Sequence, residues 1–108
     1  MVSLVAMKRQ LEAERAELQA EIKELDEILE VKPDYTLGAG DPAVYQWEFN
    51  LARRSQAMEK LQAVEQALSR IDEGRYGRCE RCGHEIESER LELLPSTSLC
   101  ARCAQTRR

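Results

Sequence analysis

Four cysteines near the end of the chain form the pattern with the clearest chemistry. Cys79 and Cys82 make one C-x-x-C pair, Cys100 and Cys103 make a second, and seventeen residues separate the pairs. Two residues between cysteines let both sulfurs bind one ion, and a second pair completes a tetrahedral shell of four thiolates. A closed shell is typical of structural zinc, whereas catalytic zinc keeps one position open. The pattern therefore predicts one structural Zn²⁺ ion and no catalytic residues.

Other uses of these cysteines fit the rest of the chain less well. A redox-active C-x-x-C motif of the thioredoxin type needs a βαβ context, which the sequence does not offer. The chain shows no secretion signal and no apolar run of membrane-spanning length. We therefore expect a cytoplasmic protein with reduced cysteines and no membrane association. His84 lies beside the first pair, and we expect it to be near the metal without binding it, because four thiolates already satisfy the ion.

The composition favours long helices over a compact core. Of the 108 residues, 33% are charged and 5% are aromatic, which is too little bulky apolar material for an ordinary globular core but suits amphipathic helices. The net charge of -4 argues against general binding to nucleic acids or anionic membranes, which requires a clustered surplus of Lys and Arg. We expect one elongated helical element and a small metal module.

A heptad repeat predicts a first helix over about residues 3–31. The aliphatic residues of its stripe are Leu4, Met7, Leu11, Leu18, Ile22, Leu25, Ile28 and Leu29. The recurrence of leucine every seven residues is the pattern of a coiled-coil seam. Pro33 is the first helix breaker in the chain and disfavours helical geometry in the residue before it, so the helix should end there.

A second helix is predicted from Pro42 to about Asp72. Asp41 can accept a backbone N–H as the N-cap, Pro42 suits the first helical position, and Gly74 provides a stop. The apolar stripe of this helix consists of Val44, Trp47, Leu51, Met58, Leu61, Val64, Leu68 and Ile71. Arg54 interrupts the stripe, which predicts a local weakening of the seam.

The short connection between the helices determines how they pair. Each helix would be roughly 45 Å long, and a connection of about nine residues reaches at most roughly 32 Å. The helices therefore cannot run parallel side by side, and an antiparallel hairpin is expected. The predicted fold is all-α, with a coiled-coil hairpin over residues 1–73 whose tip is at about 32–41. A four-cysteine zinc-finger module with a short C-terminal helix follows over residues 74–108.

Aromatic residues around the predicted turn are candidate partner contacts. Four of the five aromatic residues of the chain lie there: Tyr35, Tyr45, Trp47 and Phe49. Trp47 is part of the apolar stripe and is expected to fill the end of the hairpin. Tyr45 and Phe49 lie off the stripe, and two interpretations remain open for them: packing at the tip, or an exposed patch that marks an interaction site.

Three arginines beside the first cysteine pair form a second candidate contact. Arg75, Arg78 and Arg81 can offset the negative charge of a zinc-tetrathiolate centre and of the neighbouring acids. Alternatively, they can dock on an acidic protein or a phosphate surface. The sequence favours the first interpretation.

The residues around the cysteines resemble a known family. The stretches Ala67–Ile71 and Gly74–Gly77, the C-x2-C-x17-C-x2-C frame, Arg90 with Leu91, and Pro95 are similar to the DksA/TraR zinc-finger family of bacterial transcription regulators. The resemblance is specific over about residues 67–103, and upstream only the hairpin architecture is similar. It implies a non-enzymatic protein that binds RNA polymerase, inserts its hairpin into the secondary channel, and alters promoter complexes without reading DNA sequence. Some members act with ppGpp, which is therefore a candidate ligand.

The expected tip departs from the family pattern Asp-x-x-Asp-x-Ala. Asp41 stands at the first position, while Val44 and Gln46 replace the second Asp and the Ala. Asp41 is therefore a candidate partner contact beside the aromatic residues. A second hypothesis is a zinc-stapled stress or interaction protein whose aromatic tip binds another assembly, such as a ribosome, or a second copy of itself. The two hypotheses differ in whether Asp41 or the aromatic pair matters more for activity.

Overall fold

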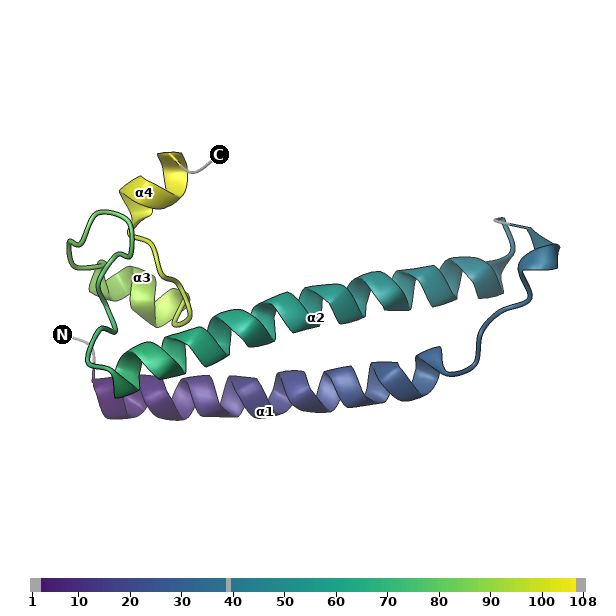
Figure 1. Cartoon of the computed structure of the whole chain (residues 1–108), viewed down its shortest axis with the longest axis horizontal. Coiled ribbons are helices and arrows are strands. Elements are labelled where there is room, and N and C mark those ends of the chain that lie inside the picture. Colours follow the sequence, from purple (N-terminus) through teal and green to yellow (C-terminus); the bar gives the residue numbers. More distant parts are fainter. Residues whose placement is uncertain (1–2, 39, 107–108) are drawn as a thin grey trace. The chain divides into compact units, whose positions relative to one another are not determined.

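Helices provide the regular structure of this protein, for which a computed structural model describes residues 3–38 and 40–106. In chain order they are α1 (Leu4–Leu29), the 3-10 helix η1 (Tyr35–Leu37), α2 (Pro42–Asp72), α3 (Ser88–Leu93) and α4 (Ala101–Thr106) (Figure 1). Extended pairing within these described residues is limited to an isolated antiparallel bridge between Arg78 and Glu85. No helix in this part of the chain is long and apolar enough to cross a membrane. The predicted all-α class, with a helical hairpin and a short C-terminal helix, is confirmed.

The chain divides into two compact units. The first consists of Met1–Arg15 and Gln62–Arg108, and the second of Ala16–Leu61. Both long helices contribute to both units, so the first turns of α1 and the last turns of α2 group with the cysteine-containing segment. The predicted division of the chain at Gly74 stays a prediction.

In the first unit, α1 and α2 pair through an apolar seam with an ion pair at its end. The buried residues of this seam are Met7, Leu11, Val64, Ala67 and Leu68. Lys8 on α1 lies 3.6 Å from the carboxylate of Asp72 on α2. Both partners are well exposed, so this ion pair adds little to the stability of the fold.

In the second unit, the contacts show that the two helices are antiparallel. Glu21 pairs with Arg53 at 3.2 Å, and the carbonyl oxygen of Leu29 accepts a hydrogen bond from Trp47 Nε1 at 3.2 Å. Residue numbers rise along α1 as they fall along α2, as in the predicted hairpin. Asp26 also pairs with Arg54 at the edge of the hairpin. The predicted weakening of the seam at Arg54 stays a prediction.

The buried stripe of α2 differs from the predicted one. Leu51 and Met58 are 41% and 43% exposed, whereas Asn50 and Ala57 are buried. Successive residues of a helix are rotated by about 100°, and the heptad that leads back from Val64 passes through Ala57 and Asn50. The prediction followed the largest apolar side chains, but the seam at this level is formed by a small residue and a polar one. On α1, the predicted seam residues Leu4 and Ile28 are likewise largely exposed.

Trp47 fixes the end of α1. Its indole ring is half-buried, stands edge-on to Tyr35 with ring centroids 6.2 Å apart, and donates its N–H to the Leu29 carbonyl. The last carbonyls of a helix have no partner within the helix, and this hydrogen bond supplies one. The helix ends at Leu29, before the predicted end at about residue 31. The expectation that Trp47 fills the tip is confirmed.

Two aspartates cap the helices of the tip. The Asp41 carboxylate accepts the backbone N–H of Ala43 at 2.9 Å, as predicted, and α2 begins at Pro42. Asp34 is the N-cap of η1. The sequence analysis did not predict this short helix. The Asp34 carboxylate accepts the backbone N–H and the hydroxyl of Thr36 at 2.9 and 2.6 Å, and these hydrogen bonds lower the pKa of Asp34.

We predict that Asp41→Ala lowers the free energy of unfolding of the hairpin by about 1 kcal/mol, because the Ala43 N–H loses its acceptor. Asp41→Asn should retain most of the stability, since asparagine caps about as well as aspartate. Urea unfolding followed by far-UV circular dichroism measures both changes, with the exposed Glu48→Gln as a control. Equal losses for the Ala and Asn variants would show that the charge, and not the hydrogen bond, stabilises this helix end.

Candidate metal centre

A tight turn presents the first cysteine pair. Cys79 donates its backbone N–H to the His84 carbonyl at 2.8 Å and accepts the N–H of Gly83 at 2.9 Å. Gly83 and Gly77 have φ values of +79° and +89°, which residues with a side chain rarely adopt. The chain therefore turns back within a few residues, and the side chains of Cys79 and Cys82 come together.

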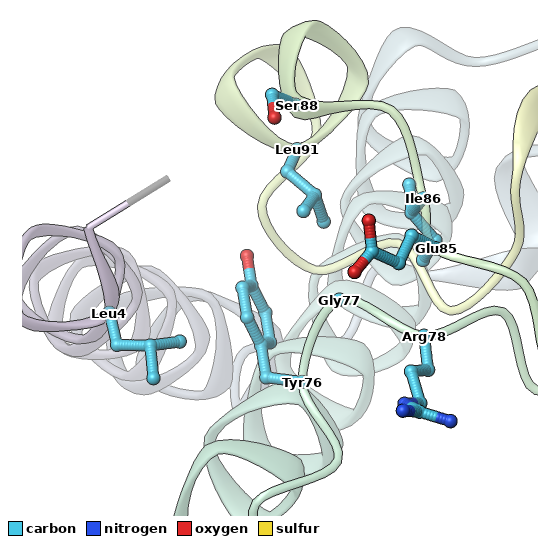
Figure 2. A pocket seen from close by; sticks show the side chains of 8 residues that line it. All are labelled: Leu4, Tyr76, Gly77, Arg78, Glu85, Ile86, Ser88 and Leu91. Atoms are coloured by element: carbon cyan, nitrogen blue, oxygen red, sulfur yellow. The ribbon is translucent and has the colours of Figure 1, made fainter. Parts of the chain in front are cut away.

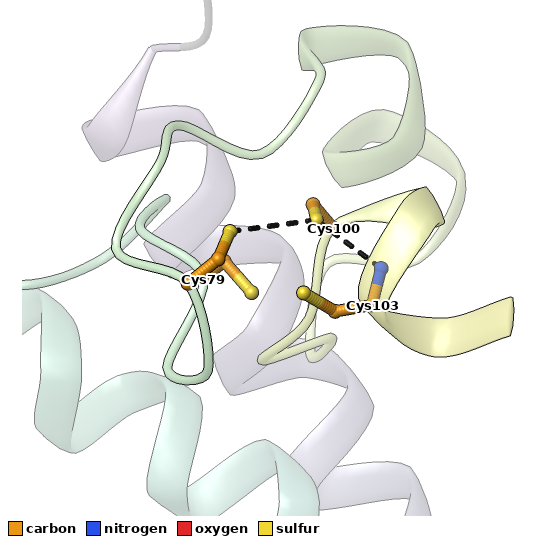
Figure 3. A group of neighbouring side chains, drawn as sticks. Cys79, Cys100 and Cys103 are labelled. Carbon is orange, nitrogen blue, oxygen red and sulfur yellow. Dashed lines mark hydrogen bonds between the residues drawn. The ribbon is translucent and has the colours of Figure 1, made fainter. Parts of the chain in front are cut away.

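The second pair lies at the start of α4. The backbone N–H of Cys103 points at the sulfur of Cys100 at 3.4 Å, and Figure 3 shows this contact beside Cys79. The backbone N–H of Glu80 donates to the Ser98 carbonyl at 2.9 Å and ties the first turn to the segment before the second pair. The predicted short C-terminal helix is confirmed by α4, which contains Cys103.

The four sulfurs form a site that fits a zinc ion. The Sγ atoms of the four cysteines all lie within 4.8 Å of one another, and those of Cys82 and Cys100 are 3.8 Å apart. Sulfurs at about 2.3 Å from a tetrahedral zinc are separated by about 3.8 Å. All four cysteines are free of disulfides, and this cluster in the described residues contains no histidine or carboxylate. When bound, zinc joins the two turns through four thiolates and leaves no position for a substrate.

The thiols of the site have unequal acidity. Burial raises the pKa of Cys79, but backbone hydrogen bonds from Cys100, Cys82 and Arg81 outweigh burial and lower this pKa to about 6. Burial and the neighbouring thiols raise the pKa of Cys103 to about 12. Backbone N–H groups thus support the Cys79 sulfur as a thiolate, while the neighbouring thiols favour the neutral form of Cys103. A metal ion must displace protons to bind all four sulfurs.

A small apolar cluster surrounds the metal site. Ile86 and Leu91 are buried with three of the cysteines, and Tyr76 and Leu99 pack against them. The Tyr76 hydroxyl donates to the Pro95 carbonyl at 2.7 Å, and burial raises the pKa of this hydroxyl. The sequence analysis did not predict α3, which positions Leu91. A segment of this size cannot bury a stable core alone, so we expect metal binding to supply most of its folding free energy.

Arg70 attaches the end of α2 to the metal module. It is 4% exposed, and its guanidinium donates to the carbonyls of Thr97 at 3.3 Å and Ser96 at 3.5 Å. Burial lowers the pKa of Arg70, and the carboxylate of Glu80, 3.9 Å away, opposes this shift. Within the module, Arg90 on α3 donates its Nε–H to the Leu99 carbonyl at 2.9 Å. The sequence analysis did not assign a role to Arg70. A charged residue among the apolar residues Ala67, Leu68 and Ile71 could have indicated a buried side chain with a specific partner.

The three candidate arginines differ in their contacts. Arg75 pairs with Glu73 and, at 3.2 Å, with Glu80, and these carboxylates raise the pKa of Arg75. The Arg81 guanidinium lies 3.4 Å from the Thr106 hydroxyl. Arg75 is thus engaged with neighbouring acids, in line with the charge-offsetting interpretation; its predicted partner contact stays a prediction, as do those of Arg78 and Arg81.

Arg78 borders a cavity of about 240 Å³ within the first unit. Leu4, Tyr76 and Leu91 form its apolar side, and Glu85 and Ser88 also line it (Figure 2). Leu4, which is 52% exposed, thus borders this cavity and is not buried in the hairpin seam. His84 contributes its backbone carbonyl to the first turn and is not in the sulfur cluster.

The remaining candidate residues lie in the second unit. Asp41 is the N-cap of α2, and Trp47 is half-buried. Tyr45 and Phe49 are 66% and 49% exposed, so the structure supports the surface-patch interpretation for this pair. Their contact with a partner stays a prediction.

Known proteins share this metal site and this fold. A model of the prokaryotic dksA/traR C4-type zinc finger matches residues 74–108. The RNA polymerase-binding transcription factor DksA of Escherichia coli strain K12 is 32% identical over 105 residues, which cover 93% of this chain and 68% of that protein. The chain belongs to the DksA/TraR family. DksA of Salmonella typhimurium is 34% identical over 89% of this chain and 65% of its own length.

The likeness to the DksA/TraR family extends to the fold. The structure of transcription factor DksA2 from Pseudomonas aeruginosa matches with a TM-score of 0.80 and 25% identity, over 95% of this chain and 81% of the other. An uncharacterized protein of Aquifex aeolicus is 49% identical over 42% of this chain, but only 31% of that protein is covered. The chain thus spans about a third of the Aquifex protein and about two thirds of the DksA proteins. The C4 zinc site of the family is present here as Cys79, Cys82, Cys100 and Cys103.

We predict that removing zinc unfolds the metal module and leaves much of the hairpin helical. Chelation should collapse the amide NMR signals of residues 79–103, while those of residues 16–61 change little. Acidification should release zinc in the same way, because protons compete for the thiolates and zinc-dependent stability is lost as pH falls. The matched control is Cys79→Ser, which should show the collapsed spectrum at neutral pH with zinc present. Retention of the native spectrum after verified zinc loss would contradict a metal-dependent module.

Replacing Arg70 by Met should lower the free energy of unfolding of the first unit by about 1–3 kcal/mol. The change retains most of the side-chain volume but leaves the Ser96 and Thr97 carbonyls without their donor. Urea unfolding of the zinc-loaded protein measures the loss, and exposed Arg75→Met is the control, expected to change stability by less than about 1 kcal/mol. Equal effects of the two changes would mean that the buried hydrogen bonds of Arg70 contribute no more than a surface ion pair.

Proposed function

We propose that this protein is a non-enzymatic transcription regulator that binds RNA polymerase and inserts its helical hairpin into the secondary channel. The observation that carries the proposal is the match to transcription factor DksA2, which extends over 95% of this chain with a TM-score of 0.80. The relatives that are 32% and 34% identical are both RNA polymerase-binding transcription factors by name. The likeness therefore includes the hairpin, which the zinc-finger match over residues 74–108 leaves out.

The chemistry of the metal centre supports a role without catalysis. Four thiolates close the coordination shell, so the ion has no position at which to activate water or polarise a substrate. Zinc instead stabilises the module that holds Arg70 and thereby the end of α2. In this proposal the metal centre acts on polymerase only through the folded surface that it maintains.

The acidic residue of the tip has a structural task as well as a proposed functional one. The Asp41 carboxylate caps α2 through Ala43, and only the remainder of its hydrogen-bonding capacity is available to a partner. Val44, which stands at the position of the second Asp in the family pattern, is 2% exposed. The tip therefore offers one acid where the family pattern has two, and we propose that its effect on polymerase depends less on paired carboxylates.

A second candidate function rests on the exposed aromatic pair. Tyr45 and Phe49 provide an apolar surface that could bind another assembly, such as a ribosome, or a second copy of this chain. In that case the pair, and not Asp41, would determine binding, and RNA polymerase would not be the target.

Binding of the zinc-loaded protein to purified RNA polymerase core tests the proposal. We expect the intact protein to be retained by immobilised polymerase, and a variant with residues 35–49 replaced by a short neutral turn to bind less. Asp41→Asn keeps the cap and removes the charge, and in vitro transcription with this variant, with and without ppGpp, measures the contribution of the acid. Full activity of Asp41→Asn would exclude an acidic-tip mechanism. Absence of binding by the intact protein would overturn the proposed function and favour the second candidate.

A further inference from the structure

The exposed surface of α2 near the tip carries an aromatic pair that the hairpin does not use. Tyr45 and Phe49 are one helical turn apart, and their side chains remain 66% and 49% exposed. The neighbouring residues Val44 and Asn50 are 2% and 6% exposed, so the seam is formed without the pair. Trp47, in contrast, is occupied by its contacts with Tyr35 and Leu29.

The two rings are arranged to offer their faces. They are nearly parallel, with an angle of 13° between their planes, and their centroids are 6.5 Å apart. Aromatic pairs in proteins have centroid separations of about 4.5–7 Å, so this pair is near the loose end of the range and gains little from its own contact. The residue one turn beyond Tyr45 and Phe49 on this surface is the small, exposed Ala52, which leaves space beside the rings.

The charge around the pair favours a cation. Glu48 lies between the two aromatic residues in the sequence and is exposed, and Asp41 precedes Tyr45 by one turn. Over residues 26–49 the sequence contains six acidic residues and one basic residue, Lys32. Arg53, the next cation along α2, is engaged with Glu21 at 3.2 Å. Such a surface repels phosphate and attracts a positively charged partner.

We propose that the surface formed by Asp41, Tyr45, Glu48 and Phe49, the aromatic-acidic face, binds an arginine side chain exposed on a basic segment of a protein partner. A guanidinium is planar and weakly hydrated, so it stacks on aromatic rings more readily than a lysine ammonium does. Glu48 supplies the opposite charge beside the rings. This inference rests on the proposed function for the identity of the partner, with polymerase as the protein that bears the arginine, while the chemistry of the face is testable without polymerase.

The test compares two capped peptides, hexa-arginine and hexa-lysine, by titration into the zinc-loaded full chain. We expect tighter binding of hexa-arginine. The double change Tyr45→Leu with Phe49→Leu removes the rings but keeps apolar, helix-forming side chains, and it should weaken hexa-arginine binding about tenfold and abolish the preference for arginine. The control Leu51→Ala alters an exposed apolar residue of the same helix and should leave both affinities unchanged. Circular dichroism confirms that each variant retains its helices.

A further variant separates charge from stacking. Glu48→Gln should weaken binding of both peptides by a similar factor and reduce the salt dependence of binding, because it removes charge without changing the rings. Unchanged hexa-arginine binding in the double variant, or a preference for arginine that survives it, would overturn the proposal. So would tighter, ring-dependent binding of hexauridylate, which would assign the rings to nucleobase stacking.

The outcome for the aromatic-acidic face is distinguishable from that of the proposed function. If peptide binding depends on the rings but the protein does not bind polymerase, the arginine site is supported and polymerase is rejected as its partner. Retention on polymerase that is unaffected by the double variant, together with arginine-independent peptide binding, would retain the proposed function and reject this inference.

Discussion

The coordination of one ion by four thiolates is the constraint on which the metal module depends. The module has few buried apolar residues, and three of those that are buried are themselves cysteines. Its remaining order comes from hydrogen bonds to loop carbonyls, such as those from Tyr76 and Arg90, which require the loop to be already in place. Coordination brings the two turns together and makes these weaker interactions effective. The metal is thus an element of the fold.

The hairpin is stabilised by a different kind of interaction. Its seam alternates between leucines and the smaller or more polar Ala57 and Asn50, and exposed ion pairs such as Lys8 with Asp72 add little energy. A buried asparagine in a coiled-coil seam costs stability but helps to specify one register. The capped helix ends, with Asp41 at the start of α2 and Trp47 at the end of α1, define where the antiparallel helices stop.

Much of this structure was predictable from the sequence because its strongest signals are local. The cysteine spacing, the Asp41 cap with Pro42, and the leucine heptad each follow from neighbours a few residues apart. The first two are confirmed, and so is the heptad from Leu11 to Leu25. The exposure of Leu51 and Met58 was not predictable from local pattern, because apolar size does not reveal which face of α2 meets α1. The role of Arg70 was missed for a related reason. Its partners are carbonyls of Ser96 and Thr97, and backbone acceptors leave no trace in side-chain sequence patterns.

The position of Trp47 has a consequence for optical studies of this protein. It is the single tryptophan of the chain, and it lies in the second unit, in contact with Tyr35 and the last carbonyl of α1. Tryptophan emission therefore reports the solvation of the tip, while the metal module, which contains only Tyr76 among the aromatic residues, is almost invisible to it. Charge-transfer absorption of a cobalt-substituted tetrathiolate would provide the complementary signal. The two chromophores report on the two units separately, so a single sample reveals whether the units unfold together or one after the other.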